Sequence, residues 1–242
     1  MDVRLEIKKS ICEIMTEDGY SSGFFTKINY KNNGIYCLMA NYNAISETML
    51  NNDYFEVKID NKCIKKIYLN KKRWSNKDLD YICIEITKDD DIEILETEDG
   101  LGDNENKYED YGSKDIIVVS INKDKKIEAK KEKLIYREKC DKFFYTCDIE
   151  KGFSGGLLIL NNNFKIIGIH YRNEIKENLT EGIYLNNIIK DINRYNLIEG
   201  IINIKNNVLF NSKEEIISET YTLFLRSFSS SNNYCYFLRN IH

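Results

Sequence analysis

Proline is absent from the 242-residue sequence, and histidine occurs only twice. The seven cysteines include no C-x-x-C pair, so the residues of a typical zinc site are missing. No apolar stretch approaches the roughly 18 residues of a membrane-spanning helix. Residues 1–9 alternate charged and apolar side chains and lack the apolar run of a secretory signal. The 35 basic residues do not outnumber the 39 acidic ones, which argues against a phosphate-backbone binder.

These absences predict a cytoplasmic protein with reduced cysteines and with no metal ion, cofactor, membrane or nucleic acid as a partner. Hydrophobic residues make up 42% of the chain, which is enough for packed cores and excludes a disordered polyelectrolyte. Only 12 glycines occur, so each is a candidate for a backbone conformation that other residues do not adopt.

Short apolar or alternating runs separated by Asn, Gly, Asp and Lys predict an all-β protein. The predicted strands are Ser10–Met15, Gly23–Asn29, Ile35–Ala40, Tyr54–Ile59, Cys63–Leu69, Tyr81–Ile86, Ile116–Ile121, Lys126–Tyr136, Phe143–Cys147, Gly156–Leu160 and Lys165–Tyr171. They form two β-blocks, which we assign to domains at 1–110 and 111–197. Residues 88–112 between them are rich in Asp, Glu and Asn, which predicts a solvated connection.

One helix is predicted near the end of the second block, at Leu185–Leu197. Its apolar residues recur at steps of three and four, which gives one buried stripe that should pack on the second β-block. The members of the stripe are Leu185, Ile188, Ile189, Ile192 and Tyr195. Residues 198–242 are left as an unassigned C-terminal tail.

The residues with the clearest chemical potential are Gly152-Phe153-Ser154-Gly155-Gly156, just before an apolar run. Glycines on both sides of a serine allow its hydroxyl to stand exposed while nearby backbone N–H groups point at one spot. Ser154 could then act as a nucleophile, with the N–H groups of Gly152 and Ser154 facing the developing oxyanion. The alternative is a glycine-rich turn that contains a serine by chance.

The sequence resembles the trypsin-like, chymotrypsin-fold serine peptidases from about Ser10 to Asn196. Ser21 to Phe25 is similar to the G-S-G-F strand of that family, and Phe144 to His170 is similar to its nucleophile segment and the strand beside it. Asp80 precedes an apolar strand, as the orienting aspartate of the family does. The resemblance implies two antiparallel six-stranded β-barrels with the site in the cleft between them, a C-terminal helix, and a peptide or protein ligand in that cleft.

One residue departs from the family pattern. The family histidine lies in a segment similar to L-[IV]-T-N-x-H-V-[IL], and the matching run here is Leu38 to Ile45, with Asn43 in the histidine position. An amide does not accept a proton near neutral pH, so Asn43 cannot serve as the general base. The resemblance makes His170 a specificity residue for an acidic or amide side chain; a plain strand histidine is the alternative. Asp80 is likewise either the orienting acid or a solvated carboxylate at a strand edge.

Three hypotheses follow. The first is a serine endopeptidase homologue with impaired catalysis, which keeps Ser154, Asp80 and the oxyanion donors. The second is an active intracellular serine endopeptidase in which Asn43 does not occupy the histidine position or another base replaces the histidine. The third is a non-enzymatic domain that binds a peptide or a partner as a scaffold.

Overall fold

The computed structural model describes residues 5–16, 19–30, 33–60, 62–98, 114–122, 124–135, 142–146, 155–174 and 179–195, without the side chains of 172–174. The chain divides into two units, Met1–Asn193 and Arg194–His242, and nearly all the described residues belong to the first. Within the described residues, no helix is both long and apolar enough to cross a membrane.

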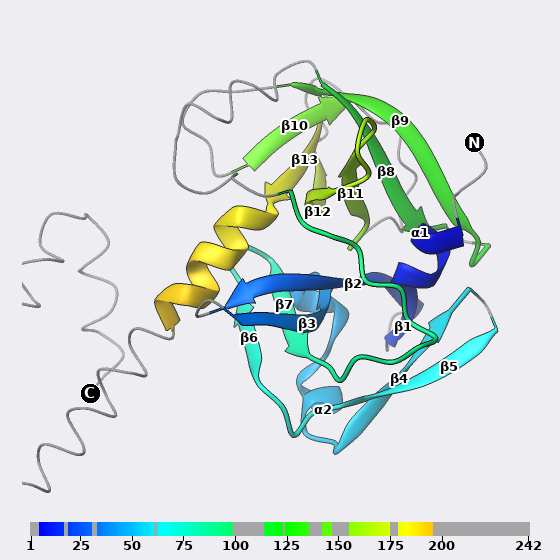
Figure 1. Cartoon of the computed structure of the whole chain (residues 1–242), viewed down its shortest axis with the longest axis vertical. Helices are drawn as coiled ribbons and strands as arrows, with labels where there is room; N and C mark the ends of the chain where they lie inside the picture. The colour runs from blue at the N-terminus through cyan, green and yellow to red at the C-terminus, as the bar shows by residue number, and fades with distance from the viewer. Residues whose placement is uncertain are drawn as a thin grey trace, which may run out of the picture. The chain divides into compact units, whose positions relative to one another are not determined.

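Strands make up most of the described chain (Figure 1). The first block contains α1 (Leu5–Ser10), β1 (Ile11–Thr16), β2 (Gly19–Tyr30), β3 (Asn33–Ala40), η1 (Tyr42–Ala44), α2 (Glu47–Leu50), β4 (Tyr54–Ile59), β5 (Cys63–Tyr68), β6 (Arg73–Asn76) and β7 (Tyr81–Glu85). The second contains β8 (Asp115–Ile121), β9 (Ile127–Ile135), β10 (Lys142–Thr146), β11 (Leu157–Leu160), β12 (Ile166–Glu174) and β13 (Leu179–Tyr184).

The second block is a closed barrel with the strand order β10-β13-β12-β11-β8-β9, and the first is a seven-stranded sheet with the order β5-β4-β1-β2-β3-β7-β6. Neighbouring strands in both are antiparallel. The predicted all-β fold class is therefore confirmed. The first block differs in detail, because its seven strands form one sheet whose outer strands are β5 and β6, in place of six strands in a closed barrel.

Three apolar clusters fill the described structure. One lies inside the first block and contains Phe25 and Leu38, and another lies inside the second and contains Phe143 and Ile167. The third is shared, since it joins residues of β1, β2, β3 and β7 to residues of β8, β11, β12 and β13. Cys12, Cys37 and Cys83 are buried free thiols and Cys63 is a partly buried one, as the sequence predicts for these four; the other three cysteines lie outside the described residues.

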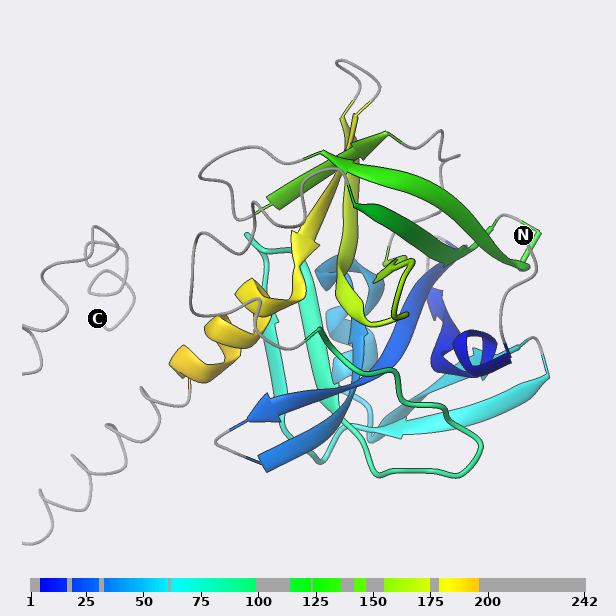
Figure 2. The same cartoon turned by 45° about the horizontal axis from the view of Figure 1, so that its top comes forward.

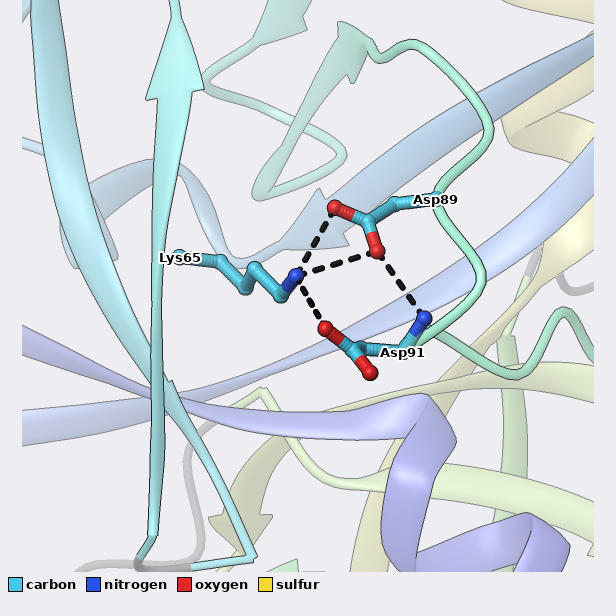
Figure 3. A network of polar contacts seen from close by, with 3 residues as sticks. All are labelled: Lys65, Asp89 and Asp91. Atoms are coloured by element: carbon cyan, nitrogen blue, oxygen red, sulfur yellow. Dashed lines mark hydrogen bonds and ion pairs between the residues drawn. The ribbon is translucent and has the colours of Figure 1, made fainter.

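The connection after β7 is less solvated than its composition predicts. Ile92 is buried, the N–H of Leu95 donates to the carbonyl of Phe25, and the N–H of Ile166 in the second block donates to the carbonyl of Glu96. Figure 3 shows a further tether, in which Lys65 Nζ of β5 donates to both carboxylate oxygens of Asp89 and to Asp91. The described part of the connection is therefore packed on both blocks, and 99–113 lie outside the described residues.

The predicted helix is present at 185–195 and continues directly from β13 (Figure 2). Leu185, Ile188 and Ile192 are buried in the shared cluster, whereas Tyr195 is 44% exposed and does not belong to the buried stripe. The helix also contacts the first block, which the sequence did not predict. Asp191 Oδ2 accepts hydrogen bonds from the hydroxyl of Tyr81 at 2.7 Å and from Asn76 Nδ2 at 3.0 Å.

Candidate functional site

The register of two adjacent strands brings the first candidate residues together. Ala40, the last residue of β3, is paired with Ile82 near the start of β7. The residues that follow β3 therefore meet those that precede β7. The 3-10 turn η1 begins at Tyr42, directly after Asn41, and Asp80 directly precedes β7.

The Asp80 carboxylate is held by this turn. Its Oδ1 accepts the backbone N–H of Tyr42 at 3.1 Å, and its Oδ2 accepts the side-chain Nδ2 of Asn41 at 2.8 Å. The backbone of Asn43 also donates to the carboxylate. Burial raises the pKa of Asp80 to about 6, although these hydrogen bonds and the charge of Lys142 oppose the rise. Asp80 is thus a half-buried, hydrogen-bonded acid and not a carboxylate that only faces solvent.

Asn43 lies in the turn that Asp80 holds, and its side chain is exposed. The contact between the two residues is made by the backbone of Asn43. The side chain that pairs with the Asp80 carboxylate belongs to Asn41, which the sequence analysis did not single out. Ser154 and Gly152, the predicted nucleophile and oxyanion residue, lie outside the described residues.

Gly155, which follows Ser154 in the sequence, is packed against the first block. Its φ of +78° lies in the left-handed region that favours glycine. A Cβ atom at this position would lie 2.0 Å from the carbonyl oxygen of Ser22 in β2 and 3.4 Å from Asn41 Oδ1. Gly155 therefore lies close to the same side chain that binds Asp80.

His170 occupies a buried position in β12 and is 4% exposed. Its Nδ1 lies 2.6 Å from the hydroxyl of Tyr145 in β10, and its backbone N–H donates to the carbonyl of Gly156 at 2.8 Å. Burial lowers the pKa of His170 to about 4, so its imidazole is neutral at physiological pH. The structure thus places the histidine beside the last glycine of the motif and gives it a tyrosine partner.

Two further residues of the region were missed by sequence reasoning. Lys142 Nζ lies 3.4 Å from Glu181 Oε2 and 4.1 Å from the centre of the Tyr171 ring, and its charge also acts on Asp80. Tyr145 is the other missed residue. Tyr145 lies in the segment that resembles the family's nucleophile segment, but the pairing of each residue was not predictable because its partner comes from another strand of the barrel. Among the described residues, no three His, Cys, Asp or Glu side chains are grouped so that they could hold a metal ion.

No protein-family model matches the chain, and no curated protein matches it in sequence. Several solved structures are similar. The serine endoprotease from Yersinia pestis gives a TM-score of 0.57 at 11% identity, over 78% of this chain and 64% of that one. Rv3671c protease from M. tuberculosis, in an inactive mutant form, gives 0.55 at 13% identity, over 78% of this chain and 87% of that one.

A viral enzyme gives a third likeness. Catalytically active tobacco etch virus protease, complexed with product, has a TM-score of 0.51 at 15% identity, over 76% of this chain and 77% of that one. The structural similarity establishes a shared fold, whereas sequence identities this low leave the activity of this chain open. The chain therefore has the chymotrypsin-like fold of these serine proteases.

Proposed function

We propose that the chain is a trypsin-like serine endopeptidase homologue with impaired peptide-bond hydrolysis, which still binds an extended peptide or a partner protein between its two β-blocks. The observation that carries this proposal is the turn held by Asp80, because the residue in that turn at the histidine position is Asn43. Ser154 would be the nucleophile, and the N–H groups of Gly152 and Ser154 would be the oxyanion donors.

The impairment follows from the chemistry of acyl transfer. A serine hydroxyl attacks a peptide carbonyl when a base accepts its proton, and the same group later protonates the leaving amine. A neutral amide does neither. Removing the histidine of such a triad costs about 10⁶-fold in turnover, and the oxyanion donors and binding alone leave roughly 10³- to 10⁴-fold acceleration over water.

His170 does not compensate for the missing base in this proposal. It is buried, and its Nδ1 is engaged with Tyr145. Its low pKa also makes it a weak proton acceptor. The other histidine, His242, lies outside the described residues.

Labelling with a fluorophosphonate tests the proposal directly. The probe forms a phosphorus–oxygen bond to an activated serine and releases fluoride, so its rate reports how readily the hydroxyl is deprotonated. We expect the wild-type protein to stay unlabelled under conditions that fully label an active serine protease. Fast labelling that disappears in the Ser154→Ala variant would refute the impairment.

We further propose that His170 selects the side chain that precedes the cleaved or bound peptide bond. When the Tyr145 hydroxyl donates to His170 Nδ1, the neutral ring carries its proton on Nε2 and can donate there. Such a donor suits the amide oxygen of Gln or the carboxylate of Glu. Because the imidazole is uncharged, it gives little compensation for desolvating a carboxylate. Gln is therefore preferred to Glu.

The preference can be measured in an Asn43→His variant with matched peptide substrates. We expect kcat/KM to fall in the order Gln, Glu and then Lys or Leu at the residue before the cleaved bond. Tyr145→Phe should reduce the preference for Gln over Leu by about 10-fold. The variant lacks the hydroxyl that donates to His170 Nδ1, so the ring proton is no longer held on Nε2. Equal cleavage after Lys, Leu and Gln by the parent variant would remove His170 from the specificity site.

A further inference from the structure

Asn41 is one of the most deeply buried polar residues of the first block, with 1% of its surface exposed. Its Nδ2 donates both to the carboxylate of Asp80 at 2.8 Å and to the backbone carbonyl of Asp80 at 3.1 Å. A carboxylate and a carbonyl only accept hydrogen bonds, so the NH₂ end of the amide has to face them. The orientation of the Asn41 side chain is therefore fixed by its partner.

Asp80 needs such a partner because its backbone is unusual. Its φ is +43°, in the left-handed region that costs most residues free energy and that Asp adopts more readily than others. By binding both the backbone carbonyl and the carboxylate of the same residue, Asn41 secures this conformation together with the direction of the side chain. The carboxylate is thereby aimed at the N–H groups of Tyr42 and Asn43.

The other end of the amide faces the second block. Asn41 Oδ1 lies 3.4 Å from the position of a Cβ atom on Gly155, in the turn after Ser154. Gly155 is also in close contact with the carbonyl of Ser22. One buried side chain thus binds the candidate orienting acid at its NH₂ end and has its Oδ1 close to Gly155.

We propose that Asn41 is a positioning residue of the candidate site, whose amide fixes the Asp80 carboxylate relative to the Gly155 turn. The role in catalysis rests on the proposed function, whereas the hold on Asp80 does not. A hydrogen bond to an ionised carboxylate favours the ionised form, so its removal should raise the pKa of that acid. Lys142 is the charged group that also acts on Asp80, and it stays in place in the experiment.

The test is a carboxyl-carbon NMR titration of Asp80 in the wild-type protein and in two variants. Asn41→Ala should raise the pKa of Asp80 by about one unit. Asn163→Ala is the matched control, because it removes another amide that donates to a carboxylate, that of Glu98, and it lies outside the turn that precedes Asp80. It should leave the titration of Asp80 unchanged. Asn41→Ser, which keeps a shorter hydroxyl donor, should give a smaller rise and serves if Asn41→Ala does not fold.

The outcomes separate the inference from the proposed function. A folded Asn41→Ala or Asn41→Ser variant in which Asp80 titrates as in the wild type would overturn the positioning role. In the Asn43→His background, loss of Asn41 should shift the acidic limb of the kcat/KM profile to higher pH by up to about one unit, because Asp80 and the new imidazole titrate as a coupled pair. If Asn43→His shows no hydrolysis while Asn41→Ala still moves the pKa of Asp80, the proposed function fails and the hold on Asp80 is supported.

Discussion

Replacing Asn43 by histidine is expected to increase peptide hydrolysis by at least about 10³-fold, because loss of the histidine in a serine triad costs about 10⁶-fold. The expected gain is large because the Asp80 carboxylate, which would accept a hydrogen bond from the N–H of the new imidazole, is already held beside position 43. The Asp80 carboxylate holds the turn through the backbone of Tyr42 and Asn43, and these contacts do not depend on the side chain at position 43. Hydrolysis of a fluorogenic peptide measures the gain.

The pH dependence of this variant has a definite sign. Asp80 has a pKa of about 6 in the present chain, and both the carboxylate and the new imidazole act in their unprotonated forms. The two groups titrate as a coupled pair, so kcat/KM should rise as the pH increases through about 6 to 7. Asn43→Gln provides the control, since it changes the size of the side chain without adding a base. A folded Asn43→His variant that hydrolyses peptides no faster than Asn43→Gln would contradict the assignment of position 43.

Gly155→Ala should be the most destabilising single-methyl change in the region, at about 3 kcal/mol. Left-handed backbone costs a residue other than glycine roughly 1–3 kcal/mol. The added methyl would also lie 2.0 Å from the backbone carbonyl of Ser22, which belongs to a central strand and cannot move away easily. The midpoint of thermal unfolding should fall by roughly 10 °C, which calorimetry can measure.

Gly19→Ala separates the two contributions. Gly19 also has a positive φ, of +132°, but an added Cβ there would have no neighbour within 4 Å among the residues that the structure describes. This variant therefore carries the backbone strain without the steric contact, and it should unfold at a higher temperature than Gly155→Ala. Equal midpoints for the two variants would show that the contact between Gly155 and Ser22 does not constrain the motif.

The fold was largely predictable because most strands carry their own signal. Tyr54–Ile59 alternates buried and exposed residues, and the structure places β4 at these residues. Strands β6 and β13 were not predicted, the first because it is short and mostly exposed, and the second because it buries polar residues. β6 is four residues long and has one buried apolar residue, Trp74. β13 buries Thr180 and Glu181, which read as polar in the sequence although the barrel encloses them.

The site was only partly predictable, because its contacts join residues that are far apart in the chain. Asp80 was predicted from its place before an apolar strand, and the structure gives its carboxylate hydrogen bonds from Asn41 and Tyr42. Asn41 is one of 29 asparagines, and its partner is 39 residues away. A usable signal was the family pattern L-[IV]-T-N-x-H-V-[IL], whose N aligns with Asn41.

The hydrogen bonds from Tyr81 and Asn76 to Asp191, together with the shared apolar cluster, affect the cooperativity of unfolding. Each β-block has an apolar cluster of its own, but the shared cluster leaves part of the apolar surface of each block covered only by the other. Unfolding of one block would expose apolar surface of the other to water, so both blocks should unfold in a single cooperative transition. Substitutions far from the candidate site can then lower the population of the folded site as a whole, without altering its local geometry.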